Sequence, residues 1–173
     1  MAVVTINCDM GESFGIYSFG NDEACLPYVT HANIACGFHA SDPIVMRRTV
    51  RLAKQYEVKI GSHPGLPDRE GFGRREMKMT REEVSALVIY QTGALEAFAR
   101  AEGMVLSHIK PHGSLMGMAQ SQEHVAQGIA DAAEIFGLPL IANANCVMSE
   151  VFSSRGLEFS CEFYVDLDYA EDG

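Results

Sequence analysis

Short runs of apolar and β-branched residues alternate along the chain with longer stretches whose apolar residues recur at helical spacing. The short runs predict six strands, at residues 3–8, the start of 33–43, 58–62, 105–109, 138–142 and 157–165. The longer stretches predict helices at residues 43–55, 80–103 and 121–137, with a short one before Gly156. Strands that alternate with helices in this way indicate an α/β fold with a mainly parallel sheet.

Three of the predicted helices begin at residues whose side chains can cap free backbone N–H groups. Asp42 stands directly before a proline, and proline at the first helical position has no N–H group to lose. Thr80 and Glu83 have the spacing of a capping box. Ser121 is expected to cap the helix that a glycine and a proline end near residue 137.

Polar residues follow the first four predicted strands and the sixth, whereas an open doubly wound sheet concentrates its chemistry at one switch point. In a β/α barrel all the loops after the strands face a common centre, so this pattern favours a TIM-like barrel, with the open sheet as the alternative. A full barrel takes roughly 250 residues. The 173-residue chain is therefore expected to form a single domain, residues 1–173, that lacks the last βα units of the barrel.

Composition narrows the classes of partner. A formal net charge of −10 argues against nucleic acid, because phosphate binding needs a basic face. No apolar run approaches the length of a membrane span, and the N-terminus lacks a basic-then-apolar signal pattern, so we expect a cytoplasmic protein with no membrane contact. The five cysteines form no CxxC pair, and small buried thiols in a reducing compartment are expected.

The candidate site is the set of polar residues at or after the strand ends, where imidazole and carboxylate groups can ligate a divalent cation or move protons. Its expected members are Asn7, Asp9, Glu12, Asn33, His39, Asp42, His63, Asp68, Arg74, Lys110, His112, Glu162 and Asp166. Lys110 is suited to steady a developing oxyanion or a phosphate. Arg74 can hold a carboxylate or phosphate with two hydrogen bonds, and it is a better candidate than Arg75.

Each candidate also has a purely structural interpretation. Asp42 can act only as a helix cap, Asp68 can make only an Asx-turn, and Asp9 can cap a loop. A single histidine beside glycine or proline is more often structural, but His39, His63 and His112 occupy equivalent places after three strands, which favours a site. The other three histidines are expected to be packing or surface residues: His31, His108 and His124.

Five segments of the chain closely resemble the LamB/YcsF family, in the family's order: NCDMGESFG, NIACGFHASDP, IGSHPGLPDREGFGRR, YQTGALEAFA and HIKPHGSL. The resemblance covers the chain from residue 3 to residue 173. It implies a deformed TIM-like β/α barrel of the glycoside hydrolase/deacetylase type. Prokaryotic members are the A subunit of 5-oxoprolinase, and fungal relatives are called lactam utilization proteins.

The resemblance therefore implies ATP-dependent opening of 5-oxoproline to L-glutamate, with ATP as cofactor and separate B and C subunits as partners. In that reaction we expect Asp9, His39, His63 and His112 to act as base, acid or ligands of a divalent metal, with Lys110 stabilising negative charge. The remaining candidates are expected to bind substrate. No Walker loop is present, so ATP is expected to bind unconventionally or through the partner subunits.

Two departures from the family and two other functions stay open. After Glu162 the family reads Phe-Ala-Asp-Arg-x-Tyr, whereas residues 164–169 read YVDLDY, with Leu167 in place of the arginine. A late His-Gly-Asp motif of the family is also missing. The alternatives are a stand-alone metal-dependent amidohydrolase or deacetylase and a non-catalytic lactam-binding subunit. Self-association into a homo-oligomer is a further option.

Overall fold

The computed structural model describes residues 4–165 and 167–168. Its strands are β1 (Asn7–Met10), β2 (His31–Ala35), β3 (Lys59–His63), β4 (Leu106–Ile109), β5 (Leu140–Ala142) and β6 (Phe159–Cys161). Its helices are α1 (Asp22–Cys25), η1 (Leu26–Tyr28), α2 (Pro43–Gln55), α3 (Arg81–Ala101), α4 (Gly113–Ala119), α5 (Glu123–Phe136) and α6 (Val147–Ser154). Among the residues described, no helix is both long and apolar enough to cross a membrane.

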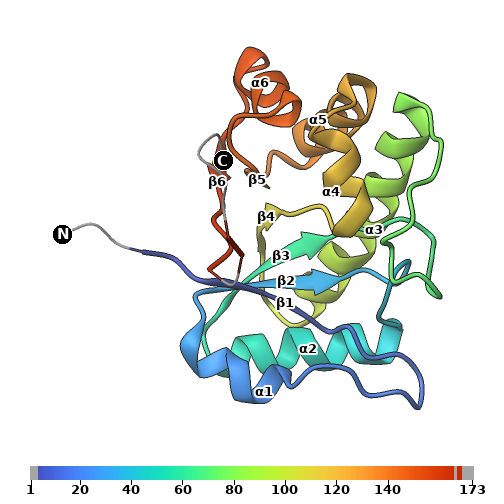
Figure 1. Cartoon of the computed structure of the whole chain (residues 1–173). Helices are drawn as coiled ribbons and strands as arrows, with labels where there is room; N and C mark the ends of the chain where they lie inside the picture. The colour runs from blue at the N-terminus through green and yellow to red at the C-terminus, as the bar shows by residue number, and fades with distance from the viewer. Residues whose placement is uncertain (1–3, 166, 169–173) are drawn as a thin grey trace.

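The six strands form one parallel sheet in the order β1-β2-β3-β4-β5-β6, so neighbours in the chain are neighbours in space. The sheet curls into a half-barrel, and the longer helices follow one another around its outer side (Figure 1). This architecture confirms the expected α/β fold and is that of an incomplete TIM-like barrel.

Apolar packing holds the helices to the sheet through two clusters of buried side chains. One lies between α2, the second half of α3 and the first three strands, and includes Ile34, Val50 and Leu95. The other joins the first half of α3 to α4, α5 and α6, and includes Val88 and Ile129. The two clusters leave the inner side of the curl to polar residues, which is where the candidate site lies.

Strand register places those polar residues on one face. In the ladder Asp9 pairs with Asn33, and Asn33 pairs with Gly61. Since side chains alternate between faces along a strand, Asn7 lies on the same face as Asp9, and His63 on the same face as Gly61. The inner face of β1, β2 and β3 is therefore polar.

Several predicted boundaries need correction. The first strand was expected at residues 3–8, but β1 begins at Asn7, because the run before it is exposed and the strand instead ends at the buried Met10. Residues 1–3 lie outside the described part of the chain. The sixth strand was expected at 157–165, but β6 covers only Phe159–Cys161, which pairs with the equally short β5.

Two predictions around α4 and α5 were incomplete or wrong. Helix α4 was not predicted, because its seven residues include two glycines and carry no clear helical period, although Leu115 and Met118 are buried. Ser121 does not cap α5: its N–H donates to Met118 O in the turn that ends α4, and Gln122 precedes the helix without a side-chain cap. Thr80 and Glu83 do form the predicted capping box of α3.

Candidate active site

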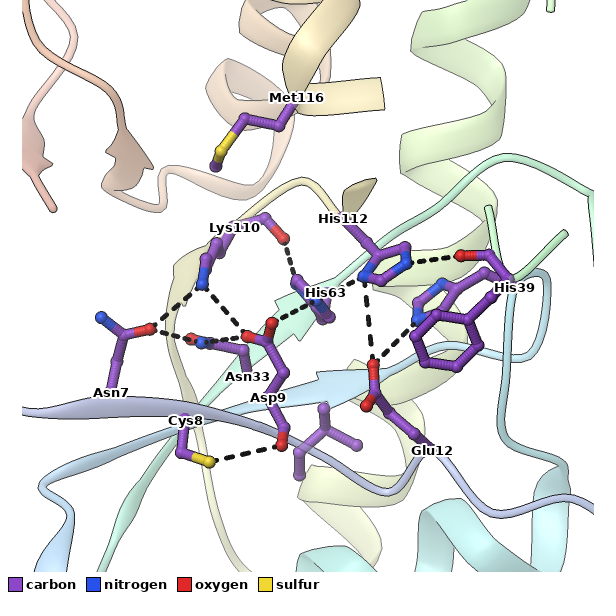
Figure 2. Close-up of polar contacts among 12 residues, drawn as sticks. Asn7, Cys8, Asp9, Glu12, Asn33, His39, His63, Lys110, His112 and Met116 are labelled. Carbon is purple, nitrogen blue, oxygen red and sulfur yellow. Dashed lines mark hydrogen bonds and ion pairs between the residues drawn. The ribbon is translucent and has the colours of Figure 1, made fainter. Parts of the chain in front are cut away.

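Side chains carried by five strands, or following them, meet inside the half-barrel, and Figure 2 shows those that come from the first four. β1 and the residues just after it supply Asn7, Asp9 and Glu12. The second strand and its loop supply Asn33 and His39, and β3 ends in His63. The fourth strand carries His108 and is followed by Lys110 and His112, while Glu162 follows β6. Parallel strands direct their carboxyl ends to the same rim, which is why residues far apart in the chain converge.

Lys110 lies at the centre of what we call the lysine network: Asn7, Asp9, Asn33, His108, Lys110 and Glu162. The Lys110 ammonium nitrogen lies 3.1 Å from Asp9 Oδ1, 3.1 Å from Glu162 Oε2 and 3.3 Å from Asn7 Oδ1. Lys110 is only 5% exposed, and a lysine has three N–H donors, so all three find an acceptor. The ammonium group is thereby held in one position.

Asn33 orders the acidic side of this network. Its side-chain amide donates to Asp9 Oδ1 at 2.7 Å and to Asn7 Oδ1 at 2.6 Å, which uses both of its protons. His108 Nε2 lies 2.6 Å from Asn33 Oδ1, an oxygen that can only accept, so the imidazole donates to it. The chain His108–Asn33–Asp9 fixes which carboxylate oxygen faces Lys110.

His108 was expected to be a packing or surface residue, and the structure gives it this additional contact. The signal that points to it is Gly61: a Cβ atom at that position would lie 2.2 Å from His108 Nε2. Glycine on β3 thus leaves room for an imidazole from β4. Burial lowers the pKa of His108 to about 3, so it is neutral and can present a single N–H to Asn33.

The second group, which we call the histidine cluster, consists of Glu12, His39, His63 and His112. His112 Nδ1 lies 3.0 Å from His63 Nε2, and Glu12 Oε1 lies 3.6 Å from His39 Nε2 and 3.9 Å from His112 Nδ1. One potential ligand atom from each of the four residues lies within 4.8 Å of the others. Imidazole and carboxylate donors in this number are suited to a divalent transition metal.

Asp9 joins the two groups, because its Oδ2 lies 3.3 Å from His63 Nε2 while its Oδ1 faces Lys110. Burial alone would raise the pKa of Asp9, but His63, Lys110 and Asn33 outweigh it and hold the pKa well below its usual range. Burial alone would lower the pKa of Lys110, but Asp9 and Glu162 raise it. The Asp9 carboxylate and the Lys110 ammonium group therefore both stay charged at neutral pH.

In the histidine cluster burial outweighs the neighbouring charges at three of the four residues, so it shifts their pKa values toward the neutral forms. It raises the pKa of Glu12, and it lowers the pKa of His39 to about 2 and that of His112 to about 3. His39 stacks on His112 with ring centroids 3.7 Å apart. Gly65 and Gly73 make this packing possible, since a Cβ at either position would come within 2.8 Å of His39 or closer.

A pocket of about 730 Å³ opens in front of both groups. Its lining includes Asp9, His63, Arg74, Lys110, His112, Asn143 and Tyr164. Tyr164 donates its hydroxyl proton to Glu162 Oε1, which holds that carboxylate against Lys110. Such a volume accommodates a small molecule with an anionic group near Arg74 or Lys110.

Two predicted site residues, Asp42 and Asp68, fall elsewhere. Asp42 caps α2 through the N–H groups of Ile44 and Val45, at 2.8 and 3.0 Å. Asp68 accepts from Gly71 N at 3.0 Å and pairs with Arg75. Their carboxylates serve the local structure that the sequence had offered as the alternative. Asp166 lies outside the described residues.

A half-barrel of parallel strands whose rim carries a buried lysine, carboxylates and clustered histidines defines a class of β/α-barrel proteins with a polar small-molecule pocket. The sequence profile of the LamB/YcsF family matches residues 4–173. The chain belongs to the LamB/YcsF family.

Individual relatives agree with this assignment. The chain is 48% identical over 172 residues to a Pyrococcus abyssi protein named as the A subunit of 5-oxoprolinase, an overlap that covers 98% of this chain and 68% of the relative. It is also 48% identical to "Lactam utilization protein lamB" of Emericella nidulans, over 97% of this chain and 66% of that protein. The crystal structure of a lactam utilization protein from Thermus thermophilus superposes with a TM-score of 0.90 at 46% identity, covering 91% of this chain and 65% of that one. The chain thus spans about two thirds of the length of these relatives.

Proposed function

We propose that this chain carries the lactam site of an ATP-dependent 5-oxoprolinase, in which it acts as the A subunit beside separate B and C subunits. The reaction opens 5-oxoproline to L-glutamate. Bacterial and archaeal relatives that bear the name of the 5-oxoprolinase A subunit support the proposal at 46–49% identity over nearly the whole chain. The structural observation that carries it is the fully hydrogen-bonded Lys110 ammonium group beside the histidine cluster in one pocket.

The ring opening can be written as three chemical steps. A lactam carbonyl resists water, and transfer of the terminal phosphoryl group of ATP to the amide oxygen releases ADP and makes the ring carbon electrophilic. Water then adds to that carbon, the C–N bond breaks, and an acyl phosphate and a free amine result. A second water converts the acyl phosphate to the carboxylate and inorganic phosphate.

The pocket residues are assigned to these steps by their charge and position. Lys110 lines the pocket as a fixed positive charge, which can offset the negative charge that develops on the attacked carbon's oxygen, while its three N–H groups stay on Asp9, Asn7 and Glu162. Arg74, exposed on the pocket wall, binds the substrate carboxylate or the phosphoryl group. His63, which lines the pocket beside Asp9, is assigned to take the proton of the attacking water, and Asp9 helps to orient that water.

The test is glutamate formation by the full complex of the A, B and C subunits. Lys110→Ala and His63→Ala in this chain are each expected to abolish ATP-dependent glutamate formation. The control is Gly93→Ala, which changes a residue in the middle of α3 where an added Cβ meets only Phe136 Cζ, at 3.9 Å. Undiminished turnover in both pocket variants would remove Lys110 and His63 from the mechanism.

The converging ligand atoms of Glu12, His39, His63 and His112 favour a second candidate, a stand-alone metal-dependent amidohydrolase. This function predicts hydrolysis by the chain without ATP and without partner subunits. An assay of the isolated chain with added zinc, with and without ATP, separates the two proposals. Tight lactam binding that never leads to turnover, even in the full complex with ATP, would contradict both and indicate a binding subunit.

A further inference from the structure

In two members of the histidine cluster, one ring nitrogen lies within hydrogen-bond distance of a backbone carbonyl oxygen. His63 Nδ1 lies 2.7 Å from Lys110 O, and His112 Nε2 lies 2.7 Å from Phe72 O. A carbonyl oxygen accepts hydrogen bonds and never donates them, so both of these nitrogens carry protons. The other nitrogen of each ring, His63 Nε2 or His112 Nδ1, is therefore the one that faces the rest of the cluster.

These two nitrogens face each other at 3.0 Å (Figure 2). Asp9 Oδ2 lies 3.3 Å from His63 Nε2, and Glu12 Oε1 lies 3.9 Å from His112 Nδ1. Two imidazole nitrogens and two carboxylate oxygens thus converge on one point. The two carboxylates favour a positive charge at this point, which a metal cation or a proton on one of the rings can supply.

His39 provides a second and independent sign that a group belongs here. His39 is only 1% exposed, and neither of its ring nitrogens has a hydrogen-bond partner. A buried polar group without a partner costs free energy, and native structures rarely keep one without a reason. Its Nε2 is directed at Glu12 Oε1, 3.6 Å away, and hence into the same convergence of ligand atoms.

From these contacts we infer that Glu12, His63 and His112 bind a divalent transition-metal cation, and that His39 completes the site. Two nitrogens at the usual metal–nitrogen distance of about 2.1 Å can share one ion across 3.0 Å, at an angle of about 90°. Opening that separation by about 0.4 Å gives a tetrahedral angle. Because the His39 ring is parallel to the His112 ring, His39 ligates after its ring turns out of the stack.

The donor set selects the kind of ion. Three imidazoles and one carboxylate suit zinc and its neighbours cobalt and nickel, whereas magnesium and calcium prefer oxygen ligands throughout. The hydrogen bonds from His63 and His112 to backbone carbonyls have the form of outer contacts that orient metal-binding histidines in proteins. When bound, the ion would supply a Lewis acid beside Asp9. The inference stands on side-chain geometry and does not depend on the lactam substrate.

The test measures metal binding by the full-length chain, purified without a histidine tag and stripped with a chelator. Zinc and cobalt are added separately, and bound metal is measured by mass spectrometry and titration calorimetry. The wild-type chain is expected to bind about one ion. Glu12→Gln, His63→Gln and His112→Gln are each expected to weaken binding by more than about 100-fold, and His39→Gln by roughly 10- to 100-fold. His124→Gln, which changes an exposed histidine on α5, is the matched control and should leave the affinity unchanged.

A second measurement keeps the result clear if a variant folds poorly. In the wild-type chain labelled with ¹⁵N in the histidine rings, zinc should shift the signals of His63 Nε2 and His112 Nδ1 and leave the protonated nitrogens protonated. The inference is overturned if the folded wild-type chain binds neither metal and the spectra show a proton shared between His63 and His112. It is equally overturned if all three glutamine variants retain wild-type affinity. Lactam turnover enters neither readout, so this inference and the proposed function can fail separately.

Discussion

The lysine network and the histidine cluster lie side by side in one pocket but differ in how far their hydrogen-bonding groups are satisfied. Around Lys110 every ammonium proton has an acceptor, and both amide protons of Asn33 are used. In the histidine cluster His63 Nε2 and His112 Nδ1 face each other, and neither ring nitrogen of His39 has a hydrogen-bond partner. A satisfied network is pre-organised to position a substrate, whereas an unsatisfied cluster is where a further group binds.

The largest loss of unfolding free energy is expected when the lysine network loses its cation. Lys110→Ala leaves the carboxylates of Asp9 and Glu162 in the pocket without a counter-charge, and breaking such a pair costs about 3–5 kcal/mol of unfolding free energy. Urea denaturation at neutral pH measures this. The exposed Lys78 gives a matched control, and Lys78→Ala should change stability by less than about 0.5 kcal/mol. A loss below about 1 kcal/mol for Lys110→Ala would show that the network is not a stabilising unit.

Added side-chain volume next to the histidine cluster is expected to lower the stability of the folded chain. Gly65→Ala places a Cβ 2.3 Å from His39 Nδ1, so the imidazole must move, and overpacking of this kind costs about 1–3 kcal/mol. Thermal unfolding compares it with Gly93→Ala in α3, where the nearest atom is 3.9 Å away and the substitution should stabilise by about 0.5–1 kcal/mol. If both variants are equally stable, His39 is not held in place as the contacts indicate.

Acid should destabilise the folded chain through His108 of the lysine network. His108 has a pKa lowered to about 3 by burial, against about 6.5 in the unfolded chain. The unfolded chain therefore takes up a proton below pH 6.5 that the folded chain does not, so stability is complete above that pH and falls by about 1.4 kcal/mol per pH unit below it. His108→Gln keeps a donor for Asn33 and removes this titration. Urea titrations at pH 7.5 and 5.5 should show a shallower pH dependence in the variant, and an unchanged slope would contradict the assignment.

The smallest effect is expected at Asp42, which lies outside both groups. Asp42→Ala removes the cap of α2 and should cost about 1 kcal/mol, while turnover by the full complex stays at the wild-type level. Thr80→Ala, which removes the corresponding cap of α3, should behave alike. A loss of turnover with Asp42→Ala alone would return that carboxylate to the candidate site.

The sequence predicted the order of strands and helices and the convergence of Asp9, His39, His63, Lys110 and His112, because parallel strands bring their carboxyl ends to one rim. The chemical roles of these residues remain predictions. Asp42 and Asp68 share the same sequence context as the pocket acids, and nothing in the spacing distinguishes a carboxylate that caps a helix from one that faces a substrate.

His108 shows why part of the network could not be predicted. Its contact with Asn33 depends on a β3–β4 register that shifts between Ile60 and Ser62, and on the space that Gly61 leaves. Register shifts of this kind follow from tertiary packing and have no local sequence signal. Helix α4 was missed for a related reason, since its buried face is made by only two turns of residues.

The protons on His63 and His112 are fixed by the carbonyl groups of Lys110 and Phe72, and every amino acid has a carbonyl group. Replacing the phenyl ring of Phe72, or the amine of Lys110, removes a side chain but keeps the main-chain oxygen that orients each imidazole. The tautomers of this pocket are therefore set by the path of the polypeptide, and they should persist in any homologue that follows the same path, even where those two side chains have diverged.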